Sequence, residues 1–152
     1  MLSWCAILLA INLTGPPMDP LPIDEVLIVA RTVWQEARGE SREGKRAVVH
    51  VLHNRAQKRG TDMAYEAHRP SQFSGWNTGE VNRLKSRQQG LESPSFRRAF
   101  LATLEAIEEI DEGVDPVKGA THYHADYVSP PWAKGFTPVV TIGRHRFYVG
   151  IP

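Results

Sequence analysis

The chain has 152 residues, a length that suits one domain with a single hydrophobic core. Hydrophobic residues make up 41% of it and charged residues 23%, which is ordinary for a globular protein and excludes a disordered or low-complexity chain. The formal charge of +1 gives no overall basic field, so we expect no nucleic acid among the partners. The single cysteine, Cys5, excludes an intramolecular disulfide framework and a site built from several thiolates.

The N-terminal segment, residues 1–22, combines an apolar run with a proline-rich connector. The apolar run spans about ten residues, roughly half of what a transmembrane helix needs, so we expect no stable membrane span. No Lys or Arg precedes Arg31, which is atypical of a cleavable signal peptide. We therefore expect a buried N-terminal helix with Cys5 in the core, and an atypical export or membrane-release signal is the alternative.

Two amphipathic helices are predicted in the first half of the chain. The first runs from about Ile23 to Arg38, and its apolar face consists of Val26, Val29, Ala30, Val33, Trp34 and Ala37. The second runs from Glu43 to about Arg59 and ends at Gly60. Its apolar face consists of Ala47, Val48, Val51, Leu52 and Ala56.

The middle segment, Thr61 to Gly90, has no sustained periodicity and is predicted to form loops and short turns. A third helix is predicted to begin at Ser93-Pro94, because proline is tolerated in the first helical turn, and to end at Gly113. Its apolar face consists of Phe96, Ala99, Phe100, Leu104, Ile107 and Ile110.

From Gly119 onward the pattern changes to short strands. The predicted strands are Thr121–His124, Val139–Ile142 and His145–Val149, and Gly143-Arg144 is expected to join the last two in a hairpin. Helices followed by a small antiparallel sheet near the C-terminus are typical of a mainly helical α+β domain, here residues 23–152.

Glu36 is the strongest candidate for chemistry. It lies at the edge of the apolar face of the first helix, and partial burial there would raise the pKa of its carboxyl toward that of a general acid. Glu40 follows one turn later. The alternative is that both carboxylates are structural and pair with Arg38 or Arg42.

A loop around residues 72–77 places flat aromatic rings beside amide and hydroxyl groups. Its candidate binding residues are Gln72, Phe73, Ser74 and Trp76. Such a mixture suits sugar rings, whose C–H faces stack on aromatic rings while their hydroxyls form hydrogen bonds. The alternative is a small apolar cluster beneath a long loop.

The histidines leave two interpretations open. In a strand His122 and His124 face the same side, and with His145 they could supply three ligands to zinc. No HExxH spacing accompanies them, so neutral hydrogen-bonding side chains are the preferred interpretation, and we expect no metal and no cofactor. The pair His50 and Asn54 is spaced for hydrogen bonding between helices.

Several motifs occur in an order that resembles the SleB-like cell wall hydrolases, the spore-cortex-lytic family. They are Ala30–Glu40, Val51–Arg55, Gln72–Ser74 and Gly119–His124, followed by Val128–Trp132 and by a hairpin that ends in Phe147-Tyr148. The resemblance extends over roughly Ile23 to Val149. One departure is Trp34-Gln35, since the family commonly has a glycine just before its glutamate.

The resemblance implies a lysozyme-like domain that cuts peptidoglycan between N-acetylmuramic acid and N-acetylglucosamine. The catalytic glutamate of the family carries over to Glu36, while Glu40 and Asn54 are expected to be supporting residues. The residues expected to bind the glycan strand are Gln72, Phe73, Ser74, Trp76, His122, Tyr123, His124, Trp132 and Tyr148.

The expected mechanism is that of a single-glutamate lytic transglycosylase. Two-carboxylate mechanisms need acids on both sides of the sugar, whereas Glu36 and Glu40 are expected on the same side of one helix. The acids left open as a partner are Glu66, Glu80 and Asp126. The alternatives are a hydrolytic muramidase, a zinc-dependent amidase or peptidase using His122, His124 and His145, and a non-catalytic wall-binding module.

The short chain resembles a phage or prophage endolysin more than a spore enzyme. Such a protein is made in the host cytoplasm and released to the wall at lysis, so we expect action at the bacterial wall or periplasm. We also expect a monomer. Attraction to anionic wall material would come from two basic clusters, which are Arg42, Lys45, Arg46 and Arg83, Lys85, Arg87.

Overall fold

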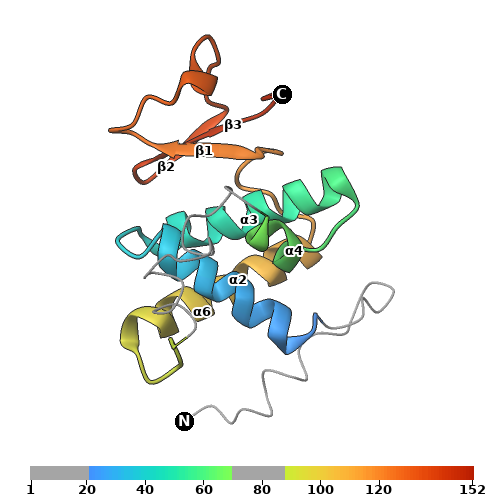
Figure 1. The fold of residues 1–152 in the computed structure, drawn as a ribbon, viewed down its shortest axis with the longest axis vertical. Helices are drawn as coiled ribbons and strands as arrows, with labels where there is room; N and C mark the ends of the chain where they lie inside the picture. Colours follow the sequence, from blue (N-terminus) through green and yellow to red (C-terminus); the bar gives the residue numbers. More distant parts are fainter. Residues whose placement is uncertain (1–20, 70–87) are drawn as a thin grey trace.

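The computed structural model describes residues 21–69 and 88–152, in which helices come first and a small sheet last (Figure 1). Predictions for residues 1–20, for Gln72, Phe73, Ser74 and Trp76, and for Glu80 lie outside these ranges. The elements are α2 (Ile23–Glu36), α3 (Arg42–Arg59), α4 (Met63–His68), α6 (Pro94–Asp111), β1 (His122–Ala125), the 3-10 helix η2 (Pro131–Ala133), β2 (Val140–Ile142) and β3 (His145–Tyr148). The predicted α+β class is confirmed.

Local side-chain chemistry sets the ends of the two long helices α3 and α6. The Ser41 hydroxyl accepts a hydrogen bond from the Gly44 amide at 3.1 Å, which satisfies one of the free amides at the start of α3. Gly60 ends that helix with a φ of 66°, a left-handed conformation that glycine adopts without a steric penalty. Ser93 caps α6 in the same way as Ser41, with Pro94 in the first turn.

Two details differ from the sequence prediction. Helix α2 ends at Glu36 instead of Arg38, because Ala37 leaves the helical conformation with φ −132° and ψ 27°. A short helix, α4, lies in the segment predicted to form loops. Its start is visible in the sequence, because the Asp62 carboxylate accepts the Tyr65 amide at 2.6 Å, but six residues are too few to show a helical period.

Helix α3 is the central element, and it packs on both sides. Val48, Leu52 and Ala56 contact α2 and α6 in the larger apolar cluster. Ala47 and Val51 face the sheet in a second cluster with Phe147. The apolar faces predicted for the first two helices are buried as expected.

On α6 the predicted apolar face is only partly correct. Phe96 and Ala99 are fully buried, and Phe100, Ile107 and Ile110 pack against the larger cluster. Leu104 is 38% exposed, so its assignment to the buried face was wrong. The buried positions of this helix include Ala102, Thr103 and Ala106, so the face is rotated away from Leu104.

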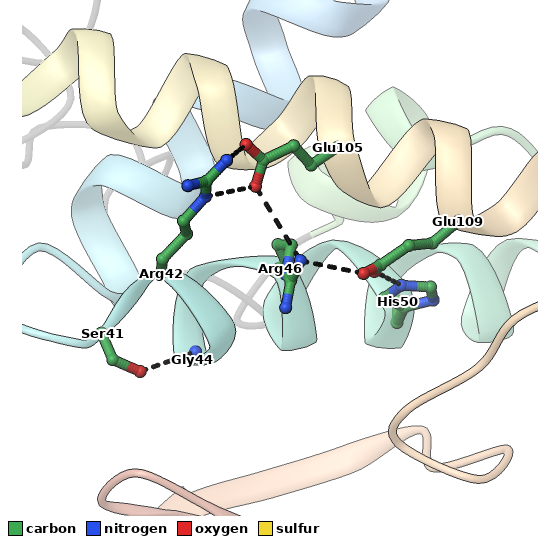
Figure 2. Close-up of polar contacts among 7 residues, drawn as sticks. All are labelled: Ser41, Arg42, Gly44, Arg46, His50, Glu105 and Glu109. Carbon is green, nitrogen blue, oxygen red and sulfur yellow. Dashed lines mark hydrogen bonds and ion pairs between the residues drawn. The ribbon is translucent and has the colours of Figure 1, made fainter.

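The three strands form one antiparallel sheet in the order β1-β3-β2, and it packs on the face of α3 away from α6 (Figures 1 and 2). The predicted hairpin joins β2 and β3. Tyr123 pairs with Phe147 and Ala125 pairs with His145, so these four side chains share the sheet face. His122 and His124 point to the opposite face.

None of the helices in the described ranges combines the length and the hydropathy that a membrane span requires.

Candidate active site

A cleft of about 310 Å³ lies where the end of α2 meets α3 and the sheet. Helix α2 contributes Glu36, helix α3 contributes Arg55, and the strands contribute Tyr123 and His145. The remaining lining residues follow from β1 into the next loop, and they are His124, Ala125, Tyr127 and Val128.

Glu36 is the last residue of α2 and points into this cleft. Burial raises the pKa of its carboxyl from 4.5 to about 7, because a desolvated carboxylate loses hydration. The positive charge of Arg55 and a hydrogen bond from Tyr123 both act in the opposite direction. A carboxyl with this pKa is partly protonated near neutral pH, so it can both donate and accept a proton.

Tyr123 connects the sheet to Glu36. Its hydroxyl hydrogen-bonds the Glu36 carboxyl, and its ring packs on Phe147 at 5.6 Å and on His145 at 4.9 Å between centroids. Burial and the neighbouring Glu36 charge raise the pKa of the Tyr123 phenol far above its usual range. The phenol therefore keeps its proton and remains a donor to Glu36.

Arg55 is a cleft residue that the sequence analysis did not single out. Its Nε donates to the Thr121 carbonyl oxygen at 2.6 Å, just before β1 begins. The adjacent Asn54 donates its side-chain amide to the Ala120 carbonyl oxygen and to Asp115 Oδ2, both at 3.1 Å. The motif Val51–Arg55 thus anchors the segment that leads into β1. Its polar pair, Asn54-Arg55, at the end of an apolar run was the available signal.

Glu40 lies outside α2, so the expectation that it shares a helix face with Glu36 was wrong. Its Oε2 accepts the Arg144 amide at 3.2 Å, in the turn between β2 and β3. Gly143 makes this approach possible, because a Cβ atom there would lie 2.6 Å from Glu40 Oε2. Glu40 therefore connects the segment that follows α2 to the β2–β3 hairpin. A supporting role for Glu40 stays a prediction.

His122 and His124 form an aromatic cluster with Trp132 and Tyr148 on the sheet face away from α3. The His122 and His124 rings lie 5.4 and 5.6 Å from the Trp132 ring, and His124 stacks on Tyr148 at 5.2 Å. The carbonyl oxygen of Ala125 can only accept, so His124 Nδ1 donates to it, and His124 Nε2 forms a hydrogen bond with the Tyr148 hydroxyl at 2.8 Å.

Burial and the charges of Arg55, Lys58 and Arg59 lower the pKa of His122 to about 4, so its imidazole is neutral. Of this cluster, His124 also lines the cleft that contains Glu36. Glycan binding by these residues stays a prediction.

The three histidines of the zinc alternative do not converge. His145 pairs with Ala125 and therefore faces α3, whereas His122 and His124 face away from it. Within residues 21–69 and 88–152, no group of three or more His, Cys, Asp or Glu side chains could hold a metal ion. The sequence left this alternative open because strand alternation alone does not give the register of the third histidine.

Two of the three acids left open as partners of Glu36 are engaged elsewhere. Glu66 is fully buried, and its two oxygens accept from Arg59 and from the Thr61 hydroxyl at 2.7 and 2.8 Å. Asp126 pairs with Arg144 at 3.3 Å. Among the described residues that line the cleft, Glu36 is the one carboxylate.

The first basic cluster is largely neutralised by α6 (Figure 2). Arg42 forms two hydrogen bonds with Glu105, and Arg46 pairs with Glu109 at 3.0 Å. Lys45 is buried and donates to the Glu40 carbonyl oxygen. The positive charges of Arg42 and Arg46 are therefore paired with carboxylates of α6, and the second cluster lies outside the described residues.

Comparisons with known proteins agree with this geometry. Two solved structures share the fold. They are the catalytic domain of the germination-specific lytic transglycosylase SleB from Bacillus anthracis (TM-score 0.66, 24% identity, 88% of this chain and 100% of that chain) and that of the Bacillus cereus SleB protein (TM-score 0.67, 23% identity, 91% and 98%). No curated protein sequence matches the chain.

The sequence model of the Cell Wall Hydrolase family matches residues 39–148. The match begins after Glu36 and does not include that residue, so its catalytic role stays a prediction. Because the match extends over most of the chain, the protein belongs to the cell wall hydrolase family and is a cell wall-degrading enzyme.

Proposed function

We propose that this enzyme cleaves the β-1,4 bond between N-acetylmuramic acid and N-acetylglucosamine in peptidoglycan, as a lytic transglycosylase with Glu36 as its only acid–base group. The observation that carries the proposal is the Glu36 carboxyl, buried in a cleft with a pKa of about 7. Glycosidases need such a raised pKa in the group that protonates the leaving oxygen.

In the proposed reaction Glu36 donates its proton to the glycosidic oxygen as the bond from that oxygen to the muramic C1 breaks. The Glu36 carboxylate then removes the proton from the muramic C6 hydroxyl, whose oxygen bonds to C1. A 1,6-anhydro ring forms, Glu36 regains its proton, and no water is consumed. One group can serve as acid and then as base because its pKa lies near the working pH.

Two residues beside Glu36 favour its carboxylate, the form that acts as the base, whereas burial favours the protonated acid. Tyr123 donates a hydrogen bond that favours the carboxylate needed for the second step. Arg55 lowers the pKa of Glu36 as well, so the two residues together oppose the effect of burial. We extend the proposal to substrate positioning by Tyr123 and by His124, which also lines the cleft.

The lack of a second carboxylate among the described lining residues favours transglycosylation over a two-carboxylate hydrolysis. The similar structure from Bacillus anthracis is described as a lytic transglycosylase, which agrees with this choice. The endolysin role, a monomeric state and a separate N-terminal segment 1–22 remain predictions from the sequence.

The test is digestion of purified peptidoglycan by the wild type, by Glu36→Gln and by Glu105→Gln as a matched surface control. We expect Glu36→Gln to lose roughly 10²- to 10⁴-fold in activity, the usual contribution of a general acid, and Glu105→Gln to retain it. Mass spectrometry of the products should find 1,6-anhydro ends. Reducing ends would identify a muramidase instead, and substantial activity in Glu36→Gln would refute the assignment of Glu36.

A further inference from the structure

Tyr127, at the rim of the cleft, is the most exposed large apolar side chain among the described residues. Its side chain is 75% exposed, yet the residue lines the same cleft as Glu36. A single exposed aromatic ring is ordinary on a protein surface, but this one lies at the rim of the cleft, where it can contact a ligand bound there.

The ring of Tyr127 has a fixed support. The Arg144 guanidinium lies over it, 5.0 Å from the ring centroid, which is within the range of a cation–π contact. Arg144 in turn pairs with Asp126 at 3.3 Å, and its carbonyl oxygen accepts the Asp126 amide at 2.7 Å. The loop after β1 and the turn between β2 and β3 therefore hold the ring together.

Glu40, in the segment that follows α2, holds the turn that carries Arg144. The Glu40 carboxylate accepts the amide of Arg144, and Gly143 leaves the space for it. Glu36 and Glu40 are separated by one short turn of chain. The same segment therefore carries the proposed acid and fixes the hairpin behind Tyr127. A defined spacing between a reacting group and a binding surface lowers the entropy lost when a rigid substrate binds.

We infer that Tyr127 is a sugar-stacking platform that binds one N-acetyl sugar of the glycan strand next to the bond cleaved at Glu36, with Arg144 and Glu40 as positioning residues. This inference rests on the proposed function. The ring offers a flat apolar face to the C–H face of a sugar, while the charged Arg144 occupies its other side. Because the platform acts on binding, its loss should raise KM and leave kcat nearly unchanged.

The experiment measures kcat and KM on peptide-free glycan strands for Tyr127→Ala, Tyr127→Phe and Phe136→Ala. Phe136 is the matched control, because it is 41% exposed in the same connection between β1 and β2, after η2, and does not line the cleft. We expect Tyr127→Ala to raise KM roughly five- to tenfold, a typical contribution of an aromatic contact, with kcat within about twofold. Tyr127→Phe and Phe136→Ala should resemble the wild type.

Arg144→Ala and Glu40→Gln should raise KM by a smaller factor, again with little change in kcat. An unchanged KM in Tyr127→Ala, with an active wild type, would overturn the platform and leave the proposed function intact. A wild type that does not cleave glycan strands, or a Glu36→Gln variant as active as the wild type, would instead overturn the proposed function and the platform with it. Near-ultraviolet circular dichroism checks that each variant is folded.

Discussion

The carboxylates on the two sides of α3 have opposite surroundings. On the side facing α6, Glu105 and Glu109 pair with Arg42, Arg46 and His50, which recur at every fourth residue of α3 (Figure 2). On the other side, Glu36 is desolvated in the cleft, and its pKa stays raised despite the nearby Arg55. A carboxylate with adequate partners stabilises the fold, whereas an incompletely compensated one retains a proton that chemistry can use.

The largest effect on stability should follow from removing a fully paired carboxylate. Glu66 is 0% exposed and accepts from Arg59 and Thr61, with Arg69 Nη1 3.5 Å away. Glu66→Gln would keep the shape but leave two guanidinium groups without their counter-charge. We expect a loss of about 3 kcal/mol in the free energy of unfolding, measured by urea denaturation. A loss below about 0.5 kcal/mol would show that this pair is not structural.

Removing the cleft carboxylate, Glu36, should increase the free energy of unfolding, whereas removing Glu66 should decrease it. The folded-state pKa of Glu36 is about 7 and the reference value is 4.5, so the folded state binds this proton more tightly than the unfolded state. Folding is then penalised as pH rises from 4.5 to about 7, by roughly 3 kcal/mol in total.

Glu36→Gln removes that penalty. We expect the variant to be more stable than the wild type near pH 8 by roughly 3 kcal/mol, and the two proteins to differ least near pH 4. Urea unfolding at both pH values measures the difference. An equal stability gap at the two pH values would mean that Glu36 titrates normally, which would remove the contrast between the two sides of α3.

The smallest effect should come from the exposed end of the α3–α6 contact. Arg42 has a side chain that is 69% exposed, so its pair with Glu105 is screened by water. We expect Glu105→Gln to cost about 0.5 kcal/mol or less in unfolding free energy, and less still at high salt. A loss of unfolding free energy near that of Glu66→Gln would show that solvent exposure does not determine how much each of these ion pairs stabilises the fold.

Much of the fold follows from local patterns in the sequence. The burial of Val29, Val33 and Leu52 follows from helical periodicity, and the hairpin follows from Gly143-Arg144 between two short apolar runs. Periodicity does not predict helix α4, because its six residues are positioned by the Asp62 cap and by contacts with α2 and α3.

The candidate site could be predicted only in part. Glu36 stands out because a charged residue interrupts an apolar helix face. Its contact with Tyr123 depends on how the sheet packs against α3, and no local pattern contains that information. Tyr127 was missed for the same reason, since a tyrosine in a loop is ordinary until the cleft forms beside it. Arg55 had a local signal in the polar pair Asn54-Arg55, but its place in the cleft also depends on how the sheet packs.

The most direct test of the account is an NMR titration of the Glu36 side-chain carboxyl, with specific ¹³C labelling and Glu36→Gln to assign the signal. We expect this carboxyl to titrate with a pKa of about 7. In Tyr123→Phe the value should move higher, because the hydrogen bond that favours the carboxylate is lost. A pKa near the ordinary 4.5 would contradict the central claim that burial in the cleft makes Glu36 the acid of this enzyme.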